Sequence, residues 1–313
     1  MKSLNRVYSR LDMQRRYEAW FLRFGVADGS GAWWLRYLLM NPGRSGCPRV
    51  QGAAPAQVWA TWFPREGHPE TFIQEFPVKA VNLTSRSQPF SLKIGPNAIE
   101  EDGCRGAIEA RGEKISWDLR YLSHFGTTLS NKGWIGFSRT PHSDAVIRGS
   151  IRLGERVFRG DPLGMGVQGH NCGFRHRNFW TWMHACFPQP DHSMSTLEAL
   201  VYEMPLGLRF RKAVLWHEGR AYVFRSLREH MRDSAALRWE FSGTAGAGSI
   251  EVEVSGRGPS LHRLPYAKTD CSGTFEVSNN SRAGARVRAR LAKVPPVELA
   301  TEGGAVLEMT GEY

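Results

Sequence analysis

Residues 166–187, GVQGHNCGFRHRNFWTWMHACF, carry more structural information than any other stretch of this chain. The second half alternates as a β-strand does, so that every second side chain faces the same side. One face carries Trp180, Trp182, His184 and Cys186. Because an indole N–H is costly to bury without a partner, such a row fits the wall of a cavity for a flat apolar molecule. An aromatic ladder that closes a barrel is the alternative.

The first half of this stretch places glycines on both sides of His170 and Asn171. Glycine adopts dihedral angles that other residues avoid, so we expect a tight loop that holds both side chains in place. His170 can exchange a proton near neutral pH, and Asn171 can orient it or polarise a carbonyl group. The competing interpretation is a plain turn whose side chains cap neighbouring strands.

The rest of the chain consists of short β-rich runs closed by turn residues. RYEAWFLRFG (16–25) and AWWLRYLLM (32–40) are separated by the glycine-rich VADGSG and predict a hairpin. Further runs of this kind follow at short intervals, without the alternation of strands and helices that an α/β fold requires. The sequence therefore predicts an all-β protein built from two tandem antiparallel β-barrels.

A length of 313 residues suits two domains. The turn-rich SRTPHSD (138–144) predicts the boundary, which gives an N-terminal barrel over residues 1–140 and a C-terminal barrel over residues 141–313. Similar strand–turn–strand runs recur between residues 94 and 122, but the sequence alone does not establish an internal duplication.

The first of these strands contains an acidic candidate. Strand alternation places Glu18 and Trp20 on one face and Tyr17 on the other. If the face of Glu18 points into a barrel, burial would raise the pKa of its carboxyl toward the range useful for proton transfer. A salt bridge at the rim of a barrel is the alternative.

Composition and motifs argue against several classes of function. The net charge is +11, but the basic residues are scattered and no nucleic-acid-binding module accompanies them, so we expect no nucleic-acid partner. No GxSxG, Walker A or dinucleotide fingerprint occurs in a fitting context, which leaves covalent, phosphoryl-transfer and hydride-transfer chemistry without support. Four histidines lie close together in sequence, but their spacing fits no zinc pattern, so we expect neither a metal nor a cofactor: His170, His176, His184 and His192.

The five cysteines are odd in number and irregularly spaced, which favours a reducing compartment. We find no signal-peptide pattern and no apolar run near twenty residues, so we expect a cytoplasmic protein. Arg286, Arg288 and Arg290 share one strand face. The simpler interpretation is that this row of arginines lies on a solvated outer face. The alternative is that it makes peripheral contact with an anionic membrane.

These residues resemble a lipocalin-like family that includes bacterial carotenoid 1,2-hydratases (hydroxyneurosporene synthases), plant tocopherol cyclases, AttH-type bacterial proteins and fungal decalin-forming Diels–Alderases. The pattern of that family opens with Tyr-Glu-x-Trp-Tyr, which is similar to Tyr17, Glu18 and Trp20. Its middle carries Gly-x-x-x-His-Asn-Trp-Gly and then Trp-x-Trp, which is similar to Gly169, His170, Asn171, Gly173, Trp180 and Trp182. Cys172 stands where the family has a tryptophan, which removes an aromatic wall and leaves the substrate open.

The resemblance implies two lipocalin-like barrels with a ligand cavity in or between them. It also implies chemistry without a redox cofactor, either addition of water or an internal hydroxyl to a protonated alkene or a pericyclic ring closure. In such a site Glu18, His170 and Asn171 would be catalytic, and the substrate would contact mainly aromatic residues: Tyr17, Trp20, Trp34, Trp180, Trp182 and His184.

The predicted partner is an apolar polyene or prenyl small molecule, and the oligomeric state stays open. We favour a hydratase, cyclase or isomerase. A non-catalytic carrier of a lipid or other hydrophobic ligand needs the same cavity and is the alternative.

Overall fold

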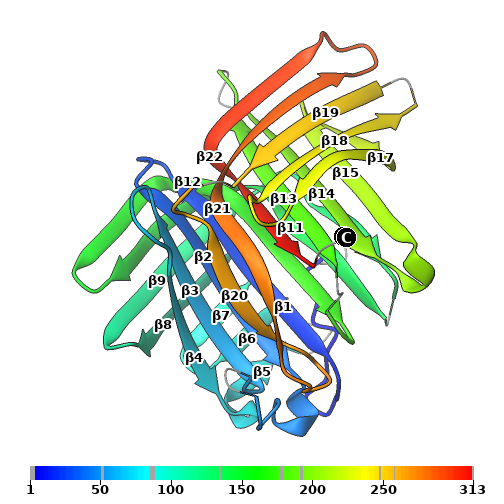
Figure 1. The fold of residues 1–313 in the computed structure, drawn as a ribbon. Helices are drawn as coiled ribbons and strands as arrows, with labels where there is room; N and C mark the ends of the chain where they lie inside the picture. Colours follow the sequence, from blue (N-terminus) through cyan, green and yellow to red (C-terminus); the bar gives the residue numbers. More distant parts are fainter. Residues whose placement is uncertain are drawn as a thin grey trace.

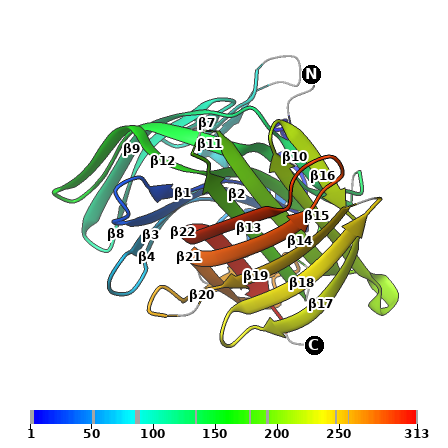
Figure 2. The ribbon, with the colours of Figure 1, turned by 90° about the horizontal axis from the view of Figure 1, so that it is seen from above.

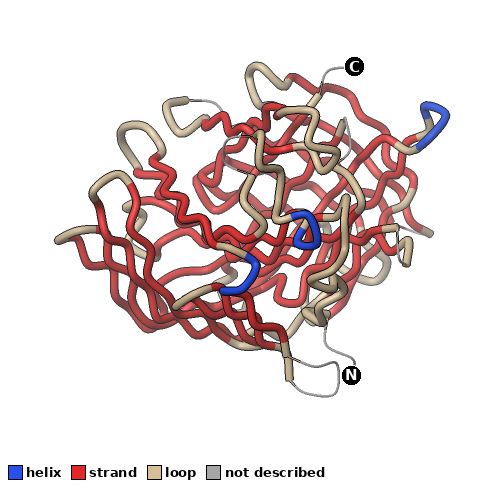
Figure 3. The backbone as a smooth tube through the Cα atoms, turned by 90° about the horizontal axis from the view of Figure 1, so that it is seen from below, coloured by secondary structure: helices blue, strands red, loops and turns tan. Residues whose placement is uncertain are grey.

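The computed structural model describes residues 4–50, 53–84, 89–133, 135–176, 179–190, 193–246, 248–256 and 258–311. These residues form antiparallel β-strands joined by turns, and the helical segments among them are short 3₁₀ turns (Figure 3). The 3₁₀ turns are η1 (Pro42–Arg44), η2 (Val78–Ala80) and η3 (Pro205–Gly207). The predicted all-β fold class is confirmed. No helix in the described part of the chain is both long and apolar enough to cross a membrane.

The first sheet has twelve strands in the order β4–β3–β2–β1–β12–β11–β9–β8–β7–β6–β5, with β10 paired to β11. It curls into a nearly closed barrel, because β4 comes back into contact with β8. The strands are β1 (Tyr17–Val26), β2 (Gly31–Met40), β3 (Ala56–Pro64), β4 (Glu70–Phe76), β5 (Val81–Leu83), β6 (Ser91–Ile94), β7 (Asn97–Glu100), β8 (Gly103–Ala110), β9 (Glu113–Leu122), β10 (Thr127–Asn131), β11 (Gly136–Leu153) and β12 (Arg156–Gly173).

The second sheet has ten strands in the order β16–β15–β14–β13–β22–β21–β19–β18–β17, with β20 paired to β21. It packs beside the first sheet, as the yellow-to-red strands of Figure 1 and the view from above in Figure 2 show. The strands are β13 (Trp180–Pro188), β14 (Met194–Glu203), β15 (Arg209–His217), β16 (Arg220–Phe224), β17 (Ser226–Asp233), β18 (Arg238–Ala245), β19 (Gly248–Ser255), β20 (His262–Ala267), β21 (Thr274–Arg290) and β22 (Val297–Thr310).

The two sheets have the same internal organisation. In each, the first four strands form a meander, a long hairpin pairs back against the first strand, and one short strand pairs with that hairpin off the main path. These short strands, β10 and β20, each pack against the other sheet. Leu129 of β10 clusters with Val214 of β15, and Tyr266 of β20 clusters with Trp59 of β3. The structure thus shows the repeat that the sequence left undecided.

The change from one sheet to the other lies between Gly173 and Trp180, later than the predicted boundary at 140/141. The turn-rich residues 138–144 lie inside β11, whose pairing with β12 shifts register between Arg139 and His142 and again between His142 and Ala145. Turn-forming residues here produce β-bulges within a long strand rather than a linker.

The segment expected to be a tight loop around His170 and Asn171 is also strand, at the end of β12. Its glycines allow close approach of β1 instead of an unusual turn. A Cβ atom on Gly169 would lie 2.2 Å from the ring of Phe21, and one on Gly166 would lie 1.8 Å from the carbonyl oxygen of Arg23. The glycines therefore fix how closely β1 packs on β12.

Each sheet encloses its own apolar core, and a third cluster fills the space between them. Arg23 of β1 crosses this interface and is fully buried. Its guanidinium donates hydrogen bonds to the carbonyl oxygens of four residues in the second half: Ser281, Gly303, Gly304 and Ala305. Burial lowers the pKa of Arg23 to about 10, so the side chain stays charged at neutral pH.

A disulfide joins Cys47, which follows β2, to Cys271 in the turn between β20 and β21. The two residues are 224 positions apart in sequence, and docking of the two halves brings their Cα atoms to 5.3 Å. No sequence spacing could have indicated this pairing. A disulfide argues against the reducing compartment that the cysteine count favoured, and the cytoplasmic location stays a prediction.

Arg286, Arg288 and Arg290 of β21 are exposed, as the interpretation of a solvated outer face predicts. Carboxylates oppose it on both neighbouring strands, because Arg288 is in register with Glu251 of β19 and with Glu298 of β22. Arg286 is likewise opposite Glu253. These pairs reduce the net charge that this face would offer to an anionic membrane, and the membrane contact stays a prediction.

Candidate functional site

A cavity of about 140 Å³ lies between the two halves. Strands β1, β2, β10 and β12 contribute to its lining from one side, and β13, β14, β20 and β22 from the other. A cavity of this size accommodates a ring-sized apolar group. Its lining includes Ile135 and Arg175, which are exposed, so it opens to solvent there.

One part of the lining is apolar and largely aromatic. Phe21 meets Trp34 edge-on at 5.9 Å between ring centroids and meets Trp182 in the same way at 5.4 Å. Leu200 and Tyr202 continue this surface along β14. Side chains from both sheets thus build one surface for a flat apolar ligand.

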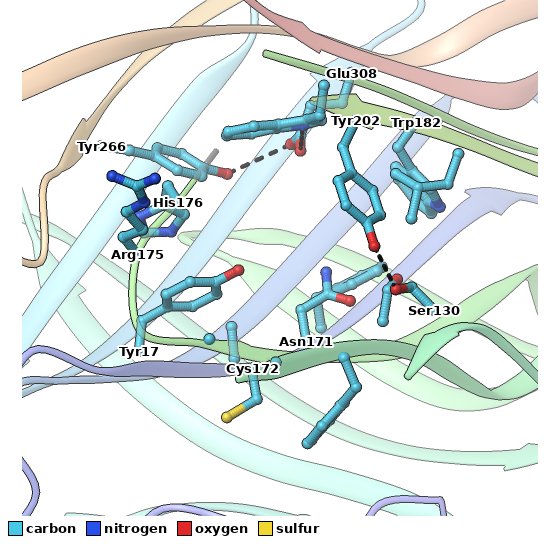
Figure 4. A pocket seen from close by; sticks show the side chains of 18 of the residues that line it. Tyr17, Ser130, Asn171, Cys172, Arg175, His176, Trp182, Tyr202, Tyr266 and Glu308 are labelled. Carbon is cyan, nitrogen blue, oxygen red and sulfur yellow. Dashed lines mark hydrogen bonds between the residues drawn. The ribbon is translucent and has the colours of Figure 1, made fainter. Parts of the chain in front are cut away.

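A buried carboxyl group, Glu308 of β22, lies beside Trp182 on the wall that the second sheet forms (Figure 4). Its Oε1 accepts a hydrogen bond from the indole of Trp180 at 3.0 Å. Its Oε2 lies 3.5 Å from the hydroxyl of Tyr266 and 3.5 Å from the side-chain amide of Asn279. Burial raises the pKa of Glu308 above its ordinary value, which favours the protonated form.

Asn171 occupies the corresponding position in the first half. On β12 it is in register with Ala19 of β1, and on β22 Glu308 is in register with Trp182 of β13. Since β12 and β22 hold equivalent places in the two sheets, the internal repeat places an amide on one side of the cavity and a carboxyl on the other.

The residues proposed from sequence lie in three different places in the structure. Five of them line the cavity: Tyr17, Trp34, Asn171, Trp180 and Trp182. Glu18, Trp20 and His170 lie on the opposite faces of the same strands, inside the first barrel, and are completely buried. His184 lies between the sheets outside the cavity lining, where its Nε2 is 2.7 Å from the carbonyl oxygen of Ser143.

Glu18 and His170 form a buried pair, with 2.8 Å between the Oε1 of Glu18 and the Nε2 of His170. The carboxylate also accepts hydrogen bonds from the backbone N–H groups of Tyr8 and Ser9, and the other ring nitrogen of His170 contacts the carbonyl oxygen of Leu4. Trp20 stacks on His170 at 4.5 Å. This cluster fastens the segment before β1 to the first barrel.

Replacing Glu18 with glutamine tests that structural role. The amide keeps one acceptor oxygen but places an NH₂ group against N–H donors, so we expect a loss of about 2 kcal/mol in the free energy of unfolding. Urea unfolding measures the loss, and hydrogen exchange should become faster at the amides of Tyr8 and Ser9. The matched control is Glu70→Gln, at the exposed start of β4. Unchanged exchange at both amides would contradict the assignment.

Cys172, which stands where the family has a tryptophan, is among the residues that line the cavity. Its sulfur points away from the cavity in Figure 4 and accepts a hydrogen bond from Nη2 of Arg16 at 3.0 Å. The effect of this replacement on the ligand site stays a prediction.

Sequence reasoning did not select several polar residues that line the cavity, among them Arg36, His176, Tyr266 and Glu308. The sequence analysis considered His176 only as one of four histidines close together in sequence. His192, another of those four, lies outside the described residues. In the described ranges, no three His, Cys, Asp or Glu side chains are grouped as metal ligands. One signal was available for Glu308, since it is the only charged residue in the apolar run Ala305–Met309.

The sequence matches no known protein-family profile and no curated protein. Solved structures nevertheless share its fold across nearly the whole chain. CghA is 11% identical with a TM-score of 0.61, and the match covers 95% of this chain and 88% of CghA. Kievitone hydratase from Nectria haematococca is 12% identical with a TM-score of 0.57, covering 99% and 95%. An AttH-type protein from Nitrosomonas europaea is 12% identical with a TM-score of 0.53, covering 97% and 95%.

Proposed function

We propose that this protein is a cofactor-independent hydratase, cyclase or isomerase whose substrate is an apolar polyene or prenyl small molecule. The observation that carries the proposal is Glu308, a buried carboxyl with a raised pKa on the wall of an aromatic cavity. Such a group is protonated more often near neutral pH than an ordinary glutamate and can act as a general acid. The fold shared with kievitone hydratase supports the choice of reaction class.

Six lining residues have roles in this mechanism. Glu308 transfers its proton to an alkene carbon, and the hydroxyl of Tyr266 and the indole of Trp180 then stabilise the carboxylate that forms. The faces of Trp182 and Trp34 stabilise the carbocation. Asn171, on the opposite side, orients a polar group of the substrate.

The chemistry balances without a cofactor. In hydration, water adds to the cation and loses a proton that returns to Glu308, so the product gains one water molecule. In cyclisation, an internal hydroxyl replaces the water and the mass is unchanged. A pericyclic closure would need only the shape of the cavity and a hydrogen bond from Asn171 to a carbonyl oxygen.

Incubation of the protein with a panel of polyenes and prenylated phenols in H₂¹⁸O tests the proposal. Mass spectrometry distinguishes hydration, which incorporates ¹⁸O, from isomerisation or cyclisation, which changes only retention time. We expect Glu308→Gln to lower turnover at least about a hundredfold while ligand binding is retained. Glu70→Gln, remote from the cavity, should turn over at the wild-type rate.

The alternative function is that of a carrier for a lipid or other hydrophobic ligand, because the same cavity serves both roles. Tight binding without any change in the ligand across the panel would favour the carrier. Turnover that Glu308→Gln leaves unchanged would instead exclude Glu308 as the proton donor and favour a pericyclic reaction.

A further inference from the structure

Two polar side chains on one wall of the cavity have buried nitrogen atoms that nothing satisfies. Nη1 of Arg36 and both ring nitrogens of His176 are shielded from solvent and have no hydrogen-bond partner among the described residues. Buried polar atoms without partners are rare in folded proteins, because each costs free energy. Two such groups close together indicate a ligand that supplies their missing hydrogen-bond partners.

The surroundings of these groups are aromatic. The guanidinium of Arg36 lies 5.0 Å from the ring centroid of Trp59 and 4.3 Å from that of Tyr266. His176 stacks on Tyr17 at 3.9 Å and lies 5.9 Å from the ring of Tyr266. Both groups thus border the ring of Tyr266, whose hydroxyl also interacts with the guanidinium of Arg36. Nη1 of Arg36 and the ring nitrogens of His176 stay without a hydrogen-bond partner among the described residues.

The charges around the cavity favour an acidic ligand. Among the described lining residues, three carry a permanent positive charge, namely Arg36, Lys132 and Arg175, and the acidic one is Glu308. Glu308 accepts one hydrogen bond from Trp180 and lies within reach of two further donors. It also interacts electrostatically with Arg36, but burial favours its protonated form, so the positive charges of the lining outweigh it.

We propose that Arg36 and His176 form a subsite for the acidic oxygen head group of the ligand, a carboxylate, phenolate or enolate. This inference rests on the proposed function and narrows the substrate class to amphipathic molecules with an anionic end. Arg36 donates from Nη1 to the oxygen, in the strong charge-assisted geometry that guanidinium groups form with oxyanions. His176, as a neutral imidazole, donates one further N–H.

The rest of the ligand then lies on the apolar surface formed by Phe21, Trp34, Trp182 and Leu200. Figure 4 shows that His176 and Tyr266 lie on one side of the cavity and that Trp182 and Tyr202 lie on the other. A molecule anchored by its head group at Arg36 would therefore extend its apolar part toward the tryptophans of both sheets.

Calorimetric titration with matched probes tests the subsite. The probes are 2-naphthoate, its uncharged methyl ester and 2-naphthylmethylammonium, which share one ring system and differ in the head group. We expect the wild-type protein to bind the carboxylate at least tenfold more tightly than the ester, and the ester more tightly than the ammonium ion. Arg36→Met, which keeps the stem packed on the rings, should remove the preference for the carboxylate and leave the affinity for the ester unchanged.

Two further variants sharpen the result. His176→Phe keeps the stack on Tyr17, removes both nitrogens and should weaken carboxylate binding several-fold. Arg228→Met removes an exposed positive charge on β17 and should leave the preference unchanged.

Equal wild-type affinities for the carboxylate and the ester would overturn the subsite and leave the apolar cavity of the proposed function intact. Absence of binding for all three probes would contradict both proposals. The wild-type comparison decides the question even if the Arg36 variant does not fold.

Discussion

Replacing Arg23 with methionine should lower the free energy of unfolding on the order of 4 kcal/mol, because four carbonyl oxygens at the interface would lose their donor. The guanidinium is fully buried and donates to backbone oxygens of β21 and β22. Methionine fills a similar volume but offers no N–H group. The carbonyls would then be buried without partners or would draw water into the interface.

Denaturation in guanidinium chloride, followed by tryptophan fluorescence, measures this loss. Arg23→Lys keeps the charge but presents three donors from one nitrogen, so it should fall between methionine and the wild type. Arg228→Met, on the exposed face of β17, controls for the loss of a positive charge. A loss below about 1 kcal/mol in Arg23→Met would show that the carbonyls find other partners.

The second large effect concerns Glu198 of β14, which is 2% exposed. Its Oε1 accepts hydrogen bonds from Thr140 at 2.7 Å and from Trp182 at 2.9 Å, whereas its Oε2 has no partner among the described residues. Burial raises the pKa of Glu198 from 4.5 to about 7. The folded protein therefore holds a proton on this carboxyl over a pH range in which the unfolded chain has released it.

Stability should fall as pH rises through this window. Below pH 4.5 the carboxyl is protonated in both states, between pH 4.5 and about 7 only the folded state keeps the proton, and above pH 7 neither does. The accumulated loss is roughly 3 kcal/mol and stays constant at higher pH. Glu198→Gln cannot ionise, so its stability should lack this contribution to the slope.

Unfolding measured at half-unit steps from pH 4 to pH 8 checks the prediction. The difference in stability between Glu198→Gln and the wild type should shift by about 3 kcal/mol in favour of the variant across this range. Glu70→Gln should follow the wild-type curve, because this position is exposed on β4. Parallel curves for Glu198→Gln and the wild type would show that Glu198 titrates normally.

Local periodicity was enough to predict the fold class and part of the cavity. Alternation identified the shared face of Trp180 and Trp182, and both line the cavity. It also separated Tyr17 from Glu18 and Trp20 correctly. It could not show which of the two faces borders the cavity, because both faces of β1 are buried, one in its own barrel and one against the second sheet.

The remaining lining residues depend on contacts that no local pattern records. Arg36 belongs to an apolar strand whose aromatic neighbour Tyr266 is more than 200 positions away in the sequence. Glu308 becomes a candidate acid only because β22 pairs with β13 beside Trp180. These residues become visible only once the two halves are docked.

The matching strand order of the two halves carries a consequence for how such a pocket can specialise. A symmetric pair of identical chains would present the same group on both walls, since one gene would encode both. A single chain that carries the repeat twice is free of that constraint, so an amide at position 171 can face a carboxyl at position 308. Tandem repetition therefore allows different polar groups on the two walls of the cavity, here an amide on one and a carboxyl on the other. Self-association of a half-length chain would not allow this difference.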